Sequence, residues 1–162
     1  MTPERAPDPP PPSLFDVLGE PAPATQSLAA LTQDNTPLAP PGHSRLTQLV
    51  AEAWSTPLPS LTCAQARLLT GQRLGLAWLA GPVARLALSQ PDLRAEHYPG
   101  DLTLAALWAF ADLLEHAPRE AWALADLDFA WMAQAYANDD ELSSHAAGLI
   151  AAARALTEPV LA

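Results

Sequence analysis

The sequence EHYPGD at residues 96–101 brings together the side chains of this chain that are most typical of catalysis. A histidine and two carboxylates so close together could act as a general acid and base, or could bind a metal ion. Such a site would support a hydrolase in which His97 works with Asp101 or with Glu96. A turn that leads into a helix is the competing interpretation of the same residues.

The turn explains the segment better than a catalytic or metal site does. Pro99 and Gly100 are typical turn residues, and they prevent His97 and Asp101 from stacking on one helical turn. Asp101 is then expected to cap the helix that follows, and Tyr98 to pack over the turn. We therefore predict a structural segment here, and no enzyme activity.

The other histidines and the single cysteine form no catalytic or metal-binding pattern. No two of the four histidines, at positions 43, 97, 116 and 145, have the spacing of four residues that helical metal sites use. His145 is expected to be partly buried. Cys63 begins an expected helix, which can activate a thiol, but no histidine is near it in sequence. No phosphate loop, dinucleotide fingerprint or nucleophile elbow is present, so neither a metal nor a cofactor is expected.

Carboxylates are concentrated in residues 112–141, where Arg119 is the only basic residue apart from histidine. Such a charge run is commonly just a solvated surface, and the alternative is a docking surface for a basic protein. The candidate partner-binding residues are Asp112, Glu115, Asp126, Asp128, Asp139, Asp140 and Glu141, and Glu120 lies among them. Asp126 and Asp128 are two residues apart and point in different directions on a helix, so they do not form a catalytic pair.

The composition of the chain argues against nucleic acid as a partner and favours a cytoplasmic location. The chain has 162 residues, of which 18 are acidic and 8 are basic, giving a net charge of −10. Nucleic acid is therefore not expected as a partner, because no concentration of positive charge is available for phosphates. A lone cysteine favours a reducing compartment. The N-terminus lacks an apolar signal segment, and no apolar run is long enough to span a membrane, so a cytoplasmic protein is expected.

The first 42 residues differ from the rest, because they hold 11 of the 18 prolines. We predict a proline-rich, largely irregular and disordered tail over residues 1–42, and a helical domain over residues 43–162. Two apolar stretches in the tail, residues 13–18 and 27–31, could form brief helical turns.

The helical domain is predicted to be a compact all-α bundle of five or six helices. The expected helices start at Ser44, at Cys63 after a capping box of Thr62 and Gln65, at Gln72 with a bend at Pro82, at Leu102, at Pro118, and after Asp140. The fifth carries a stripe of Trp122, Ala125, Phe129, Met132 and Tyr136. The sixth carries one of Leu142, Ala146, Leu149, Ala153 and Leu156.

An ordered series of short motifs runs from residue 57 into the central helix. It comprises Pro57-Leu58, Leu61-Thr62, Arg67-Leu68-Leu69, Gly71-Gln72, Gly75-Leu76, Leu79, Pro82, Ala87-Leu88 and Tyr98-Pro99-Gly100-Asp101-Leu102. In this order and spacing, residues 57–115 resemble the immunity proteins of bacterial contact-dependent growth inhibition systems.

The resemblance implies a cytosolic, non-catalytic protein that binds and neutralises a toxin delivered by a neighbouring cell. Many such toxins are nucleases with basic clefts, which suits the acidic docking surface. Its motif residues imply structural roles for Gly71, Gln72, Gly75, Leu76, Pro82, Tyr98, Pro99, Gly100 and Asp101. The alternative function is that of a helical scaffold or adaptor, which recruits partners through the proline-rich tail. The oligomeric state is left open.

Overall fold

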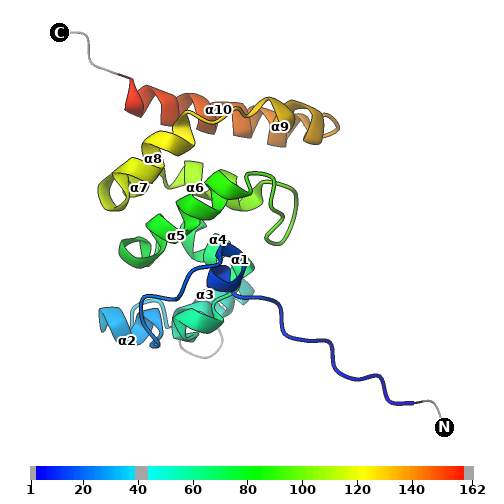
Figure 1. The fold of residues 1–162 in the computed structure, drawn as a ribbon, viewed down its shortest axis with the longest axis vertical. Coiled ribbons are helices and arrows are strands. Elements are labelled where there is room, and N and C mark those ends of the chain that lie inside the picture. Colours follow the sequence, from blue (N-terminus) through cyan, green and yellow to red (C-terminus); the bar gives the residue numbers. More distant parts are fainter. Residues whose placement is uncertain (1–2, 39–43, 159–162) are drawn as a thin grey trace.

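The protein is all-helical, as the sequence predicts. The computed structural model describes residues 3–38 and 44–158, and within these ranges it contains ten α-helices, one 3₁₀ helix and no β-strand (Figure 1). The helices are α1 (Leu14–Leu18), α2 (Leu28–Thr32), α3 (Arg45–Ser55), η1 (Leu58–Ser60), α4 (Cys63–Gly71), α5 (Leu76–Ser89), α6 (Asp101–Trp108), α7 (Phe110–His116), α8 (Pro118–Ala125), α9 (Ala130–Ala135) and α10 (Asp140–Thr157). They exceed the expected five or six because two expected helices are divided and the N-terminal segment adds two.

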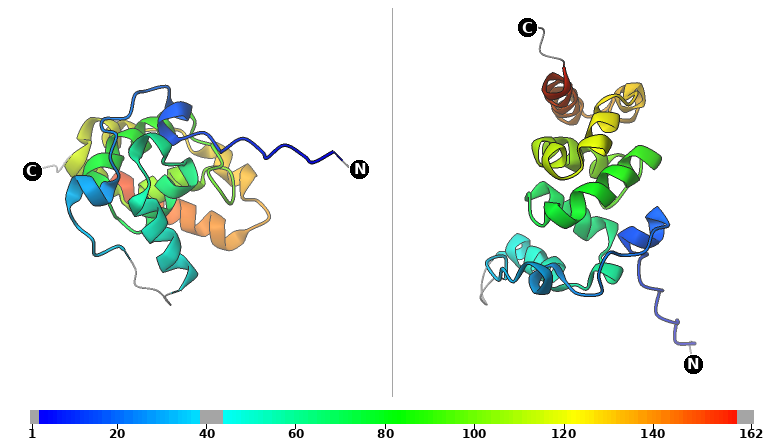
Figure 2. Two further views of the ribbon diagram at one scale, coloured as in Figure 1. Left: turned by 90° about the horizontal axis from the view of Figure 1, so that it is seen from below. Right: turned by 60° about the vertical axis from the view of Figure 1, so that its left-hand side comes forward.

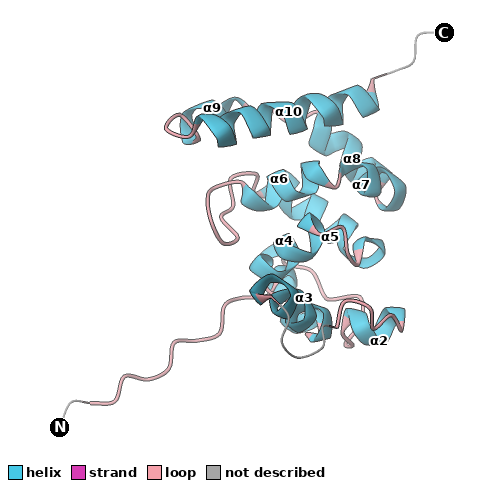
Figure 3. Ribbon diagram, turned by 180° about the vertical axis from the view of Figure 1, so that it is seen from behind, coloured by secondary structure: helices cyan, strands magenta, loops and turns pink. Residues whose placement is uncertain are grey.

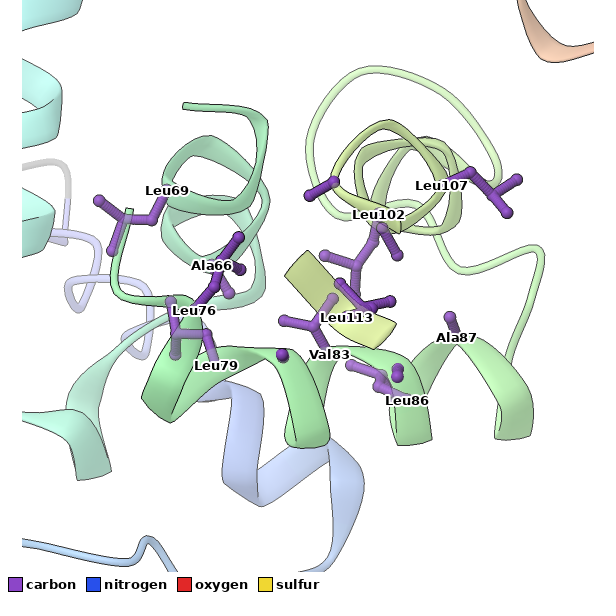
Figure 4. Close-up of a cluster of buried hydrophobic side chains, with 14 of the residues drawn as sticks. Ala66, Leu69, Leu76, Leu79, Val83, Leu86, Ala87, Leu102, Leu107 and Leu113 are labelled. Carbon is purple, nitrogen blue, oxygen red and sulfur yellow. The ribbon is translucent and has the colours of Figure 1, made fainter. Parts of the chain in front are cut away.

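The helices stack along the long axis of the molecule. Helices α2 and α3 lie at one end, α4 to α8 form the middle, and α9 and α10 lie at the other end (Figures 1 and 3). Helix α5 packs against α1, α4, α6, α7 and α8. Between α4, α5, α6 and α7 the core is made of aliphatic side chains, among which Val83, Leu102 and Leu113 are fully or almost fully buried (Figure 4).

Helix α5 is the central element, and it begins later than expected. Gly75 precedes it with φ 68°, a left-handed conformation that suits glycine. A Cβ atom there would lie 2.8 Å from Leu28 Cδ1 and 3.2 Å from Trp54 Cζ3, so this glycine lets α2 and α3 approach α5 closely. Pro82 lies inside the helix and is buried, but α5 continues past it to Ser89 and is not divided there.

Two helices expected to be continuous are each divided. The expected helix after Leu102 is interrupted at Ala109, which separates the almost wholly buried α6 from α7. The expected fifth helix ends at Ala125, and a loop leads to α9. Because the helical register is not carried through this loop, Trp122 does not share the face of Phe129, Met132 and Tyr136. Trp122 is 52% exposed, whereas the other members of the stripe are buried.

Helix α10 covers one end of the stack, but only part of the apolar stripe predicted for it is buried. Ala146 and Ala153 are buried, while Leu142 and Leu149 are partly buried. Leu156 is 55% exposed, which is contrary to the expected stripe. No further helix of the described chain lies beyond α10, so its last turns have nothing to pack against on that side (Figure 1).

The structure does not confirm an irregular tail over residues 1–42. Ser13 caps α1 through a capping box, and Ser27 caps α2. These short helices bring Leu14, Phe15 and Leu28 into the core, where each is at most 4% exposed. Burial of such apolar side chains offsets the entropy of ordering the segment.

Backbone and side-chain contacts also tie the N-terminal segment to the domain. The Leu14 amide donates to the Leu61 carbonyl over 2.7 Å, and the Trp54 indole donates to the Asp34 carbonyl over 2.7 Å. Arg85 of α5 binds both carboxylate oxygens of Glu20. Residues 3–12 are extended and exposed, and they point away from the stack (Figure 2). The predicted boundary at residue 42 lies outside the described residues.

Thr70 provides a simple test of the core around α4. This side chain is fully buried, and among the described residues its hydroxyl has no hydrogen-bond partner. A buried hydroxyl without a partner costs desolvation energy that a methyl group does not. We expect Thr70→Val, which keeps the shape, to raise the free energy of unfolding by about 1 kcal/mol in urea denaturation. A loss of stability would show that the hydroxyl has a partner in solution.

Candidate functional site

The buried carboxylate of Asp101 organises the segment that could have been an active site. Its Oδ1 accepts the Ala95 amide over 2.7 Å, and its Oδ2 accepts the amides of Glu96 and His97 over 2.9 and 2.8 Å. Asp101 is 1% exposed. Both oxygens are therefore engaged by backbone amides of the loop that precedes α6.

Asp101 was predicted to cap α6, but it does not. Gly100 is the N-cap residue, with φ 82° and no side chain to accept a bond, and Asp101 is the first residue of the helix. From there its side chain points back into the preceding loop, because three loop amides need an acceptor in the interior. The Asp101 side chain thus holds the preceding loop and not the helix end, and the predicted cap is wrong.

Arg67 of α4 lies beside this loop. Its Nε is 3.9 Å from Asp101 Oδ2, and its Nη2 donates to Glu96 Oε2 over 3.2 Å. His97 is on the outside, with Nε2 3.6 Å from Glu96 Oε2 and a side chain that is 56% exposed. Glu96 and Asp101 thus connect the loop to α4 through Arg67. Glu96 and His97 line a shallow hollow of about 340 Å³ with Arg67, but the buried Asp101 is not part of its lining.

Aromatic side chains cover the turn formed by Pro99 and Gly100. The Tyr136 hydroxyl donates to the Pro99 carbonyl over 2.5 Å. The rings of Tyr98 and Tyr136 meet edge to face at 5.8 Å, and Trp131 packs on Tyr136 at 6.2 Å. The turn is therefore covered by Tyr136 and Trp131 of the α9 region, and Tyr98 packs against Tyr136.

Burial of Tyr136 is expected to make the fold less stable at alkaline pH. Burial raises the pKa of Tyr136, and the neighbouring Tyr98 and Asp101 raise it further. Because the folded pKa lies above the unfolded value of about 10, the stabilisation is complete below pH ~10 and is lost as the pH rises above it. We expect Tyr136→Phe to flatten the fall in unfolding free energy between pH ~9 and ~11. The Tyr136→Phe variant and the protein with Tyr136 should both carry Cys63→Ala. Burial also raises the pKa of that thiol, which would otherwise add its own pH dependence in the alkaline range.

The other motif residues have structural positions. Gly71 ends α4 and Gln72 caps it, and the Gln72 amide donates to the Leu68 carbonyl. Gly75 and Leu76 form the start of α5, where Leu76 is buried. A Cβ atom on Gly71 would meet nothing within 4 Å, so packing does not require glycine at this position.

Three further candidate residues for chemistry are His145, Cys63 and His43, and of these His145 lines a shallow hollow with Arg67, Tyr98 and Asp101. His145 was expected to be partly buried, but it is exposed, because α10 turns Ala146 and Ala153 toward the core instead. The pKa of Cys63 is raised by burial and by the charge of Asp101, which disfavours the reactive thiolate. His43 lies outside the described residues. In the ranges described, no three His, Cys, Asp or Glu side chains are grouped closely enough to hold a metal ion.

The predicted acidic residues do not form a single surface. Asp112 lies 3.8 Å from Arg73, and Glu120 lies 3.6 Å from Arg85, so salt bridges engage these two carboxylates. Glu115 on α7 is 3.9 Å from His116. Helix α7 and the first turn of α10 lie toward opposite sides of the stack (Figures 1 and 3).

The other acidic residues lie around α8, α9 and α10. Asp128 accepts the Ala130 amide, and Asp139 caps α10 by accepting the Leu142 amide. Asp126, Asp140 and Glu141 are exposed. No described cation forms a salt bridge with the side chains of Asp126, Asp128, Asp139, Asp140 or Glu141. Five of the seven predicted partner-binding residues therefore remain available for a basic partner.

Arg154 holds the α8–α9 loop in place, a role that no sequence motif predicted. Its Nε donates to the Ala125 carbonyl over 3.1 Å, and its Nη2 donates to the Leu127 carbonyl over 2.9 Å. The guanidinium also lies over the Phe129 ring at 5.6 Å. Arg154 thus fixes the loop that carries Asp126 and Asp128. The available signal was a single arginine within the alanine-rich second half of α10.

None of the described helices is both long and apolar enough to cross a membrane. Comparisons with protein-family models, with curated proteins and with solved structures give no match for this chain.

Proposed function

We propose that this chain is a cytoplasmic, non-catalytic immunity protein, which binds and neutralises a toxin of a contact-dependent growth inhibition system. The structural observation that supports it most is the set of five exposed carboxylates around α8–α10 that lack a cationic partner among the described residues. The motif series from residue 57 supports the same family. The use of Asp101 as a buried loop anchor agrees with a structural role for the EHYPGD segment.

The proposed mechanism is inhibition by docking. The acidic residues attract a basic toxin and raise the association rate, while apolar contacts formed after docking slow dissociation. If the toxin is a nuclease, its cleft is basic because it must bind phosphates, and an acidic protein that covers the cleft excludes the nucleic acid.

Co-expression in a bacterial host tests this function. The full chain should restore growth when it is produced together with the toxic domain encoded beside its gene, and an unrelated acidic protein should not. Asp126→Arg with Asp140→Arg should slow association about tenfold at low salt, because two attractive charges become repulsive. Unchanged growth arrest in the presence of the intact chain would contradict the function.

The adaptor function remains the second candidate, because residues 3–12 are extended and exposed and contain a run of four prolines. Deletion of residues 1–12 separates the two functions, since it leaves the packed helix α1 in place. The inhibitor should still protect cells without these residues, whereas an adaptor that recruits through polyproline should lose its partner.

A further inference from the structure

The two exposed tryptophans at the surface differ in what covers their rings. Trp108 is 47% exposed, and the Arg73 guanidinium lies 5.1 Å from the centre of its ring. Trp122 is 52% exposed, and no described arginine lies over it. Tryptophan is enriched among the residues that contribute most to the affinity of protein interfaces.

Trp122 lies at the edge of a hollow in the surface between α8 and the end of α10. The hollow has a volume of about 590 Å³, and its lining includes Ala125, Asp126 and Arg154. A second hollow of about 590 Å³ lies on the other side of Arg154, between the start of α9 and α10, and its lining includes Asp128 and Ile150. The two hollows share Arg154 and Glu158 in their linings, and both lie beside the α8–α9 loop, so we refer to them together as the groove.

The charges of this groove are not balanced within the protein. Asp126, Asp128 and Glu158 border it. Arg154 is the one cation among the described residues that line the two hollows, and its guanidinium binds the Ala125 and Leu127 carbonyls and lies over Phe129, so three carboxylates face a single positive charge. The groove thus combines an exposed tryptophan, apolar lining residues such as Ala125 and Ile150, and an excess of carboxylates over cations.

We propose that this groove binds an arginine-bearing basic segment of the partner protein, with Trp122 as the anchor. This inference rests on the proposed function and locates its interface. The guanidinium of the partner stacks on the Trp122 ring, and Asp126 accepts its hydrogen bonds, in the same way that Arg73 already stacks on Trp108 within the chain. Arginine fits better than lysine, because its planar group stacks on an indole and binds a carboxylate with two donors.

Titration of the isotope-labelled full chain with an oligoarginine peptide, followed by NMR, tests the groove. Five indole signals are expected, and Trp122→Phe assigns the relevant one. The Trp122 indole and the amides of residues 123–128 and 150–158 should shift most. Trp122→Ala should weaken binding about tenfold, whereas Trp108→Ala should change it less than about twofold. Shifts centred on Trp108, or equal affinity of the Trp122→Ala and Trp108→Ala variants for the peptide, would contradict binding in the groove.

Charge variants test the choice of partner. Asp126→Arg should weaken peptide binding, and Arg119→Glu, one helical turn before Trp122, should strengthen it. Both differences should shrink at high salt. Oligolysine should bind several-fold more weakly than oligoarginine, and equal affinities would overturn the preference for arginine.

A growth assay separates this inference from the function on which it rests. Trp122→Ala should lose protection against the co-expressed toxin, while Trp108→Ala should keep it. If Trp122→Ala still protects, the groove is wrong and the immunity function stands. If the unaltered chain gives no protection, the immunity function itself fails.

Discussion

Replacing Asp101 with alanine should lower the free energy of unfolding by about 3 kcal/mol, because three buried loop amides lose their acceptor together. Arg67 also loses the buried carboxylate that lies 3.9 Å from its Nε. An exposed helix cap is worth only about 1 kcal/mol, so the buried network raises the expected loss about threefold. Urea denaturation at neutral pH measures the change.

Asp92 is the matched control for this substitution. It is an exposed aspartate of the same loop region, and no hydrogen bond or salt bridge of its side chain is found within the described residues. Asp92→Ala should change stability by less than about 0.5 kcal/mol. If Asp101→Ala were equally mild but abolished the activity of the protein, the aspartate would be functional and its structural role would be wrong.

Gly100→Ala should be at least as destabilising, by about 3 kcal/mol or more. The residue has φ 82°, which is unfavourable for alanine. Its Cβ atom would lie 2.6 Å from Trp131 Cη2 and 2.7 Å from the Tyr136 hydroxyl oxygen. These contacts are too short, so the aromatic cover of the turn would have to move. Thermal unfolding with circular dichroism detection measures the loss.

Gly148→Ala provides a control of opposite sign. Gly148 lies inside α10, and a Cβ atom there would meet nothing within 4 Å. Alanine should therefore stabilise the helix by about 0.5–1 kcal/mol through its higher helix propensity. If both glycine variants lost stability to the same extent, the difference between a strained turn and an open helical site would be refuted.

Local signals predicted much of the fold correctly. The capping box of Thr62 and Gln65 starts α4 at Cys63, and Ser44 caps α3, as expected from their spacing. These predictions succeed because a cap satisfies amides within a few residues of itself. The stripe on α8 and α9 failed at Trp122, because a loop between two helices can preserve apolar spacing while changing the face that is buried.

Long-range contacts limited the rest. Proline content predicted an irregular N-terminal segment, but Leu14, Phe15 and Leu28 are buried against helices distant in sequence. Likewise, Asp101 looked like a helix cap, since nothing in its local sequence indicates that three amides of the preceding loop turn toward it. Arg154 fixes a loop more than 25 residues earlier in the chain, and no local pattern encodes such a contact.

The proposed role as a toxin inhibitor depends on a direct complex with a basic protein. Biolayer interferometry between the full chain and the toxin proposed as its partner, at low and at high salt, measures the complex most directly. We predict tight binding, an association rate that falls steeply with salt, and a dissociation rate that rises at least about tenfold in Trp122→Ala. The absence of binding at low salt, or binding indifferent both to salt and to Trp122→Ala, would contradict the proposed mechanism.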